Sequence, residues 1–64
     1  MSPQAEKLRE AGWRVLEGDG VFHVLPPGAD AQHGWSRVLA NAEGNMQLVK
    51  ERSALHRQIA AVIA

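Results

Sequence analysis

The fold is decided by the last third of the chain, residues 45–64, which read NMQLVKERSALHRQIAAVIA. On a helix turning about 100° per residue, the large apolar side chains of this stretch share one sector. That sector contains Leu48, Leu55, Ile59, Val62 and Ile63, with Val49 at its edge. The pattern predicts an amphipathic helix over residues 45–64, with Asn45 as its N-cap and an apolar stripe that the rest of the protein must cover.

A shorter helix is expected at the N-terminus. Ser2 can cap the free N–H groups of a first turn, and Pro3 suits the first helical position because it has no N–H to lose. Gly12 suits the left-handed residue that ends a helix. The sequence therefore predicts a helix over residues 3–11, with a thin apolar stripe of Ala5, Leu8 and Ala11.

A β-hairpin is predicted next, from residues 13–16 and 21–25, because EGDG at 17–20 contains the Asp-Gly turn signal. A two-residue loop and a four-residue loop both fit, and they give the same two faces because their registers differ by two. One face carries Trp13, Val15, Phe22 and Val24, and we expect the C-terminal helix to cover it. The reverse carries Arg14, Leu16, Val21, His23 and Leu25, which is more apolar than a solvated face requires.

The segment after Pro26 has two interpretations. Residues 34–40 fit a third strand, whereas Trp35, Val38 and Leu39 also fit a helix opened by Asp30. We favour the strand because an isolated hairpin is barely stable in water. We therefore expect one α+β domain over residues 1–64, with a short N-terminal helix, a small antiparallel sheet of two or three strands, and a C-terminal amphipathic helix packed on one sheet face.

Composition limits the function classes. The 64 residues include seven basic and seven acidic side chains and no cysteine. Balanced charge argues against a nucleic-acid partner, which needs a concentrated basic patch. No apolar run approaches the roughly 20 residues that span a bilayer, and the N-terminus lacks a secretory signal pattern. We expect a cytoplasmic protein that does not contact a membrane.

The polar residues form no pattern typical of catalysis. His23, His33 and His56 have a spacing that matches no metal-ligand motif. Ser36, His33 and Asp30 are the residue types of a hydrolase triad, but no glycine-flanked elbow presents the serine. We expect no enzyme activity, no metal site and no cofactor.

A partner-binding surface is the sharper hypothesis. Arg52 and His56 lie beside the apolar sector of the predicted helix. They either lay their carbon stems over the edge of the core or form part of an interface, where arginine is enriched. Trp35 is likewise either a core residue or an interface anchor. We predict that a partner contacts either the sheet face around Arg14, His23 and Leu25 or the helix edge at Arg52 and His56, with Trp35 as a further partner-binding candidate.

From Trp13 onward the chain resembles a loose class of short proteins from tailed-phage and prophage genomes. These run strand, strand, strand, then a helix opened by a Glu-x-Asn-Ala-x-Leu-Ile-like motif and a later Pro-x-Leu-Leu. The counterpart here is EGNMQLV at residues 43–49, followed by Leu55. The departures are Met46 for alanine, Ser53 for proline and His56 for the second leucine. The resemblance implies an accessory protein, in a class without a common activity.

Residues 5–25 are similar to the start of HicA-type toxins, which have a double-stranded-RNA-binding-like fold and cleave messenger RNA. The similar features are a helix, Gly12-Trp13, a strand, Gly20 and His23. That family places its catalytic histidine two residues after the glycine. Phe22 stands at that position here, and His23 follows one residue later on the other face of the strand.

The leading expectation is a non-catalytic interaction module that binds and inhibits a host protein, with a host or phage protein as partner. A homodimer is compatible with this, because a small domain gains core by pairing identical patches. The alternatives are a nucleic-acid-binding regulator, using Lys50, Arg52 and Arg57 beside Arg37, and a HicA-like ribonuclease.

Overall fold

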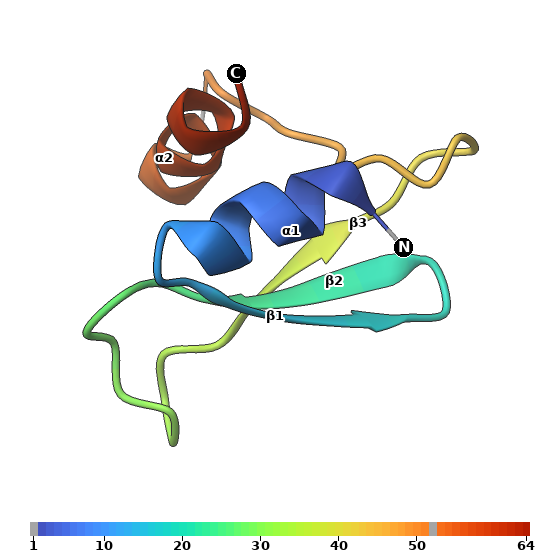
Figure 1. Ribbon diagram of the computed structural model, residues 1–64. Helices are drawn as coiled ribbons and strands as arrows, with labels where there is room; N and C mark the ends of the chain where they lie inside the picture. Colours follow the sequence, from blue (N-terminus) through green and yellow to red (C-terminus); the bar gives the residue numbers. More distant parts are fainter. Residues whose placement is uncertain (1, 52) are drawn as a thin grey trace.

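The computed structural model describes residues 2–51 and 53–64 and has two helices and a three-stranded antiparallel sheet (Figure 1). The elements in chain order are α1 (Pro3–Glu10), β1 (Arg14–Gly18), β2 (Val21–Leu25), β3 (Ser36–Leu39) and α2 (Ala54–Ile63). The sheet order β1-β2-β3 follows the chain. The predicted α+β class is confirmed.

Helix α1 begins and ends as its sequence predicts, to within one residue. The Ser2 hydroxyl accepts a hydrogen bond from the backbone N–H of Ala5 at 3.3 Å, and Pro3 occupies the first turn. The helix ends at Glu10, and Gly12 adopts a φ of +93° that turns the chain into β1. This conformation strains any residue with a Cβ, so the glycine is required here.

The hairpin has the shorter of the two predicted loops. Gly18 pairs with Val21, which leaves Asp19 and Gly20 as the two loop residues. Gly20 has a φ of +73°. The predicted faces follow, because Val15 pairs directly with Val24 and opposite residues of a ladder share a face.

Residues 36–39 form a strand and not a helix, as expected. Strand β3 pairs with β2 in antiparallel register, with Phe22 opposite Val38. Both side chains are buried in the core. The third strand widens the sheet enough for two helices to pack on it.

The predicted helix start at Asn45 is wrong, because α2 begins nine residues later at Ala54. The Asn41 side-chain oxygen accepts hydrogen bonds from the backbone N–H groups of Glu43 and Asn45 at 3.0 and 2.9 Å, and this closes a turn. The chain then returns along β3, with Met46 bridged to Ala40. Helix periodicity does not detect such a turn, since Met46 and Leu48 of the returning segment also face the core.

The N-cap of α2 is Ser53. Its hydroxyl accepts a hydrogen bond from the backbone N–H of His56 at 3.2 Å. Only the second half of the predicted stripe is therefore helical. Its members still pack as expected: Ile59 is fully buried, and Leu48, Leu55, Val62 and Ile63 lie against the core.

Both helices lie on the same side of the sheet (Figure 1). Helix α1 lies against β1, and α2 runs beside α1. Ile59 of α2 reaches the same core cluster as Leu8 of α1, Phe22 and Val38. Sequence analysis assigned the cover of this face to the C-terminal helix alone, whereas the structure shares it between the two helices. Within the described residues, no helix lies on the other side of the sheet.

Two substitutions that each shorten an apolar side chain by one carbon distinguish the two sides of the sheet. We expect Ile59→Val to lower the free energy of unfolding by about 1 kcal/mol, because Ile59 is fully buried. Leu16→Val on the open side is expected to change it by less than about 0.5 kcal/mol. Urea denaturation with an unchanged m-value measures both. Equal losses in the two variants would contradict this assignment of buried and open sides.

Candidate functional site

The candidate site is the side of the sheet that the helices leave uncovered, here called the outer face. The strand register sets its side chains in rows, with Leu16, His23 and Arg37 directly across from one another. Val21 and Leu39 form the next row toward the β1–β2 turn. The outer face comprises Arg14, Leu16, Val21, His23, Leu25, Trp35, Arg37 and Leu39.

Two leucines of the outer face are more than half exposed to solvent and do not contribute to the core. Leu16 is 57 % exposed and Leu39 is 55 % exposed, on the two outer strands. Val21 lies between these strands and is partly exposed. Large apolar side chains gathered on one ordered face are typical of a contact surface.

The opposite half of the outer face is shaped by Trp35 and Arg14. Ser36 shares the core side with its partner Val24, so Trp35, one residue earlier, belongs to the outer face. The guanidinium carbon of Arg14 lies 5.5 Å from the centre of the Trp35 ring, within the range of a cation–π interaction. Arg14 therefore reaches from β1 across the middle strand to Trp35.

Leu25 lies beneath this pair. It stands opposite Arg14 in the ladder and is only 4 % exposed. Gly34 approaches it so closely that a Cβ there would lie 2.9 Å from the Leu25 Cδ1 atom. Leu25 thus supports the site from below and offers little surface of its own.

The loop of residues 26–35 brings Trp35 to this position. The Asp30 carboxylate accepts a hydrogen bond from the Gln32 backbone N–H at 2.9 Å and pairs with the His33 ring at 3.0 Å. The hydrogen bond from the Gln32 N–H lowers the pKa of the Asp30 carboxyl below its usual value of 3.8, and the contact with His33 lowers it further by a smaller amount. A lowered pKa means that the carboxylate stabilises the loop above about pH 4 and loses this effect as the pH falls further.

The remaining predicted site residues do not join the outer face. His56 lies on α2, where its Nδ1 atom accepts a hydrogen bond from the Val49 backbone N–H at 2.6 Å. This hydrogen bond ties the segment before α2 to the first turn of the helix. Arg52 lies outside the described residues. The structure therefore brings together Arg14, His23, Leu25 and Trp35, and places His56 on the helical side.

Four outer-face residues were not among the predicted site residues. Leu16 and Val21 were expected on this face but not assigned a role, Arg37 entered only through the nucleic-acid alternative, and Leu39 was not expected on this face at all. The signal was the alternation Trp35, Arg37, Leu39 within the third strand. Once residues 34–40 are taken as a strand, this alternation places all three on one face.

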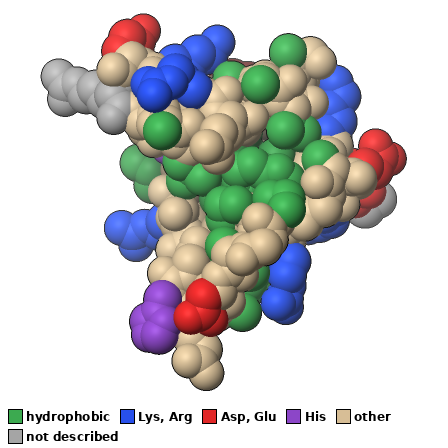
Figure 2. All heavy atoms as spheres, turned by 90° about the vertical axis from the view of Figure 1, so that its left-hand side faces the viewer, with side chains coloured by type: hydrophobic (Ala, Val, Ile, Leu, Met, Phe, Trp, Pro, Cys, Tyr) green, Lys and Arg blue, Asp and Glu red, His purple; other side chains and the backbone are tan. Residues whose placement is uncertain are grey.

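A second apolar surface lies at one end of the molecule. Figure 2 shows hydrophobic side chains gathered between α2 and the loop of residues 26–35, with basic side chains around them. Helix α2 contributes Leu55, Val62 and Ile63, each partly buried against the core. Because these side chains already pack inward, they have less free surface than Leu16 and Leu39.

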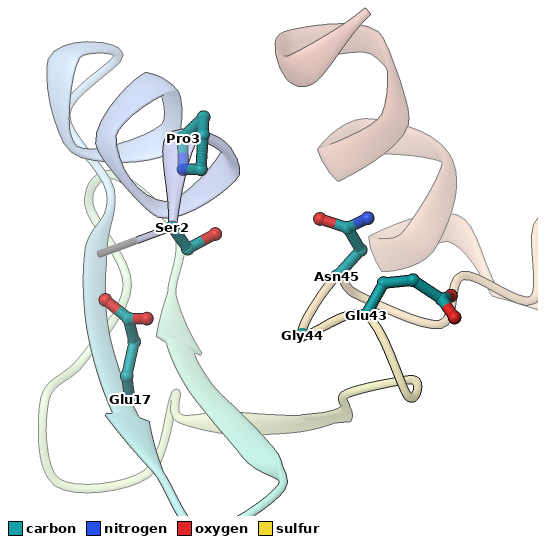
Figure 3. A pocket seen from close by; sticks show the side chains of 6 residues that line it. All are labelled: Ser2, Pro3, Glu17, Glu43, Gly44 and Asn45. Carbon is teal, nitrogen blue, oxygen red and sulfur yellow. The ribbon is translucent and has the colours of Figure 1, made fainter.

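A pocket of about 260 Å³ lies beside the start of α1 and is lined by Ser2, Pro3, Glu17, Glu43, Gly44 and Asn45 (Figure 3). The Ser2 hydroxyl is already used as a helix cap. Figure 3 shows the Glu17 side chain directed toward Ser2 and the Glu43 carboxylate directed away from it. The pocket thus lacks a nucleophile held against a base.

The histidines are dispersed. His23 lies on the outer face, His33 in the loop and His56 on α2. Within residues 2–51 and 53–64, no group of three or more His, Asp or Glu side chains is placed to hold a metal ion. Neither helix is long and apolar enough to cross a bilayer.

Comparisons with known proteins find no family model that matches this chain, and no significant match to a curated protein or a solved structure. The functional argument therefore rests on the outer face.

The two tryptophans provide a test of this arrangement. Trp13 is buried and Trp35 is partly exposed, so acrylamide should quench two populations of fluorescence. Trp35→Phe is expected to remove the accessible population. Arg14→Ala should make Trp35 more accessible, whereas Arg37→Ala, on the same face, should not. Equal quenching in the Arg14 and Arg37 variants would contradict the Arg14–Trp35 contact.

Proposed function

We propose that this protein is a non-catalytic interaction module of the phage or prophage accessory type, which binds and inhibits a host protein in the cytoplasm. The observation that carries the proposal is the outer face, where Leu16 and Leu39 remain more than half exposed with no helix or strand of the described residues over them. Covering both side chains would contribute a few kcal/mol to binding.

The local order of the outer face supports the proposal. Its side chains stand on a paired sheet, so their positions are fixed before a partner arrives. Trp35 is held by Arg14 and does not have to be ordered on binding. A preorganised surface loses less conformational entropy on association than a flexible one.

Two of the three serine hydroxyls already cap helices, which supports a non-catalytic role. Ser2 and Ser53 each accept a backbone hydrogen bond at the start of a helix. The chain contains no cysteine that could act as a nucleophile. Binding is thus the activity for which the structure offers a surface.

The test is affinity capture from bacterial lysate, compared between the unmodified chain and a Leu16→Thr/Leu39→Thr variant. Threonine keeps the β-propensity of both strand positions but removes apolar surface. We expect the captured host protein to fall by roughly tenfold or more, as for the loss of interface anchors. The purified complex should show reduced activity of the captured protein.

Val49→Thr is the matched control, because Val49 is 45 % exposed and lies away from the outer face. It should capture the partner as the unmodified chain does. Circular dichroism must show that all three proteins are folded. A partner held equally by the Leu16/Leu39 variant, or no stoichiometric partner at all, would overturn the proposal.

The element order favours a second candidate, an RNA-directed function. The order helix, three antiparallel strands, helix, with both helices on one face, is that of the double-stranded-RNA-binding-like fold implied by the HicA resemblance. Against this candidate, Phe22 occupies the position of that family's catalytic histidine, and its side chain is buried in the core.

If the chain cleaves RNA, we expect His23 on the outer face to be the catalytic residue. Under this candidate, a labelled messenger RNA is cut by the unmodified chain, His23→Ala abolishes the cleavage, and His33→Ala in the exposed loop retains it. Under the leading proposal none of the three proteins cuts the RNA. Cleavage that depends on His23 would replace the leading proposal with this one.

A further inference from the structure

We infer that the occupant of the outer face is a single segment of a partner protein that carries apolar side chains bordered by carboxylates. This inference rests on the proposed function and adds the chemistry of the partner. It is drawn from the charge, the layout and the size of the outer face.

The charge of the outer face is one-sided, although the whole chain is neutral. Arg14 and Arg37 are exposed on it and His23 stands near its centre, whereas no Asp or Glu shares it. The one acidic residue of β1, Glu17, alternates to the helical side and lies 3.6 Å from the Arg9 guanidinium. Two arginines beside an apolar patch favour a partner with carboxylates at matching positions.

The outer face changes from an apolar row at the β1–β2 turn, through a mixed row, to a row that holds Arg14 at the other end. Leu16, Val21 and Leu39 lie toward the β1–β2 turn. His23 and Arg37 share a row with Leu16, and Arg14 lies beyond that row with Trp35. A complementary segment therefore has its apolar residues at one end and its acidic residues at the other or along one side.

The size of the face favours a segment over a broad surface. Three strands about 4.8 Å apart and about five residues long give roughly 240 Å². An α-helix with its side chains is about 10 Å across, so one helix or one extended segment matches the width of this face. A second copy docked face to face brings basic side chains toward basic side chains, because no Asp or Glu shares the outer face.

A single-stranded nucleic acid fits less well. Such ligands bind by stacking bases on aromatic side chains. The outer face offers only two rings for stacking, Trp35 and His23, and Arg14 already lies over the Trp35 ring. Exposed leucines match aliphatic partners better than they match bases.

The first experiment selects 16-residue peptides from a random displayed library on the immobilised full chain. Peptides that also bind the Leu16→Thr/Leu39→Thr variant are removed. We expect the survivors to combine apolar residues with Asp and Glu and to lack Lys and Arg. Survivors without acidic enrichment would overturn the inference but leave the proposed function standing, whereas no survivors would overturn both.

The second experiment reverses one charge and measures the affinity of a selected peptide. Arg37→Glu should weaken binding roughly tenfold or more, and added salt should weaken binding to the unmodified chain. Lys50→Glu, in the segment leading to α2, makes the same charge change away from the face and should have no effect. Equal effects of the two reversals would overturn the inference.

Two further measurements exclude the other occupants. Sedimentation of the chain at 100 µM should give the monomer mass, and a dimer that is lost in the Leu16/Leu39 variant would overturn the inference in favour of a second copy. A 20-nucleotide oligothymidine should not bind at low salt. Binding that Arg37→Glu abolishes would overturn the inference in favour of nucleic acid.

Discussion

The structure depends on the burial of one short helix between the sheet and α2. Ala5 and Leu8 of α1 are fully buried, in a helix of only eight residues that would not form alone in water. Polar contacts hold it on both sides. Arg9 donates to the Val15 carbonyl at 2.8 Å, and Lys7 donates to the Ile63 carbonyl at 3.3 Å. The Gln4 side chain accepts from the Met46 backbone N–H at 2.8 Å.

The placement of α1 has a consequence for the other side of the sheet. Both helices contribute to the core side, so the described residues place no helix or further strand over the outer face. The protein covers part of that face by itself, through Arg14, Trp35 and the loop over Leu25. These groups do not cover Leu16 and Leu39, which stay exposed. The apolar surface of the outer face thus stays exposed because both helices lie on the core side of the sheet.

Local signals predicted most of the fold. The Ser2-Pro3 start and the Asp-Gly turn follow from chemistry within a few residues. The strand at residues 36–39 was favoured over a helix because a hairpin needs a third strand to be stable. The start of α2 was not predicted, because distant partners take the backbone N–H groups that follow the predicted cap: Met46 donates to the Gln4 side chain and Gln47 to the Leu39 carbonyl. Periodicity reports which residues face the core, and Met46 and Leu48 face it without being helical.

The site could be predicted only in part for a similar reason. The reverse face of the hairpin follows from alternation alone, which is why Arg14 and His23 were assigned to one surface. Leu39 required the register of a third strand, and register is a tertiary property. His56 was assigned to a surface from its place on a helix. Its hydrogen bond to Val49 depends on how the preceding segment folds back, which the sequence pattern does not contain.

The sheet edges explain why a partner is expected on the face. An exposed edge strand invites a further strand from another chain. At β1, the Arg9 guanidinium donates a hydrogen bond to the Val15 carbonyl and lies beside the Glu17 carboxylate. At β3, the returning chain bridges Met46 to Ala40 and donates the Gln47 N–H to the Leu39 carbonyl at 2.8 Å. With both edges partly occupied by the chain's own groups, strand addition is hindered, and the side chains of the outer face remain the most accessible apolar surface for recognition.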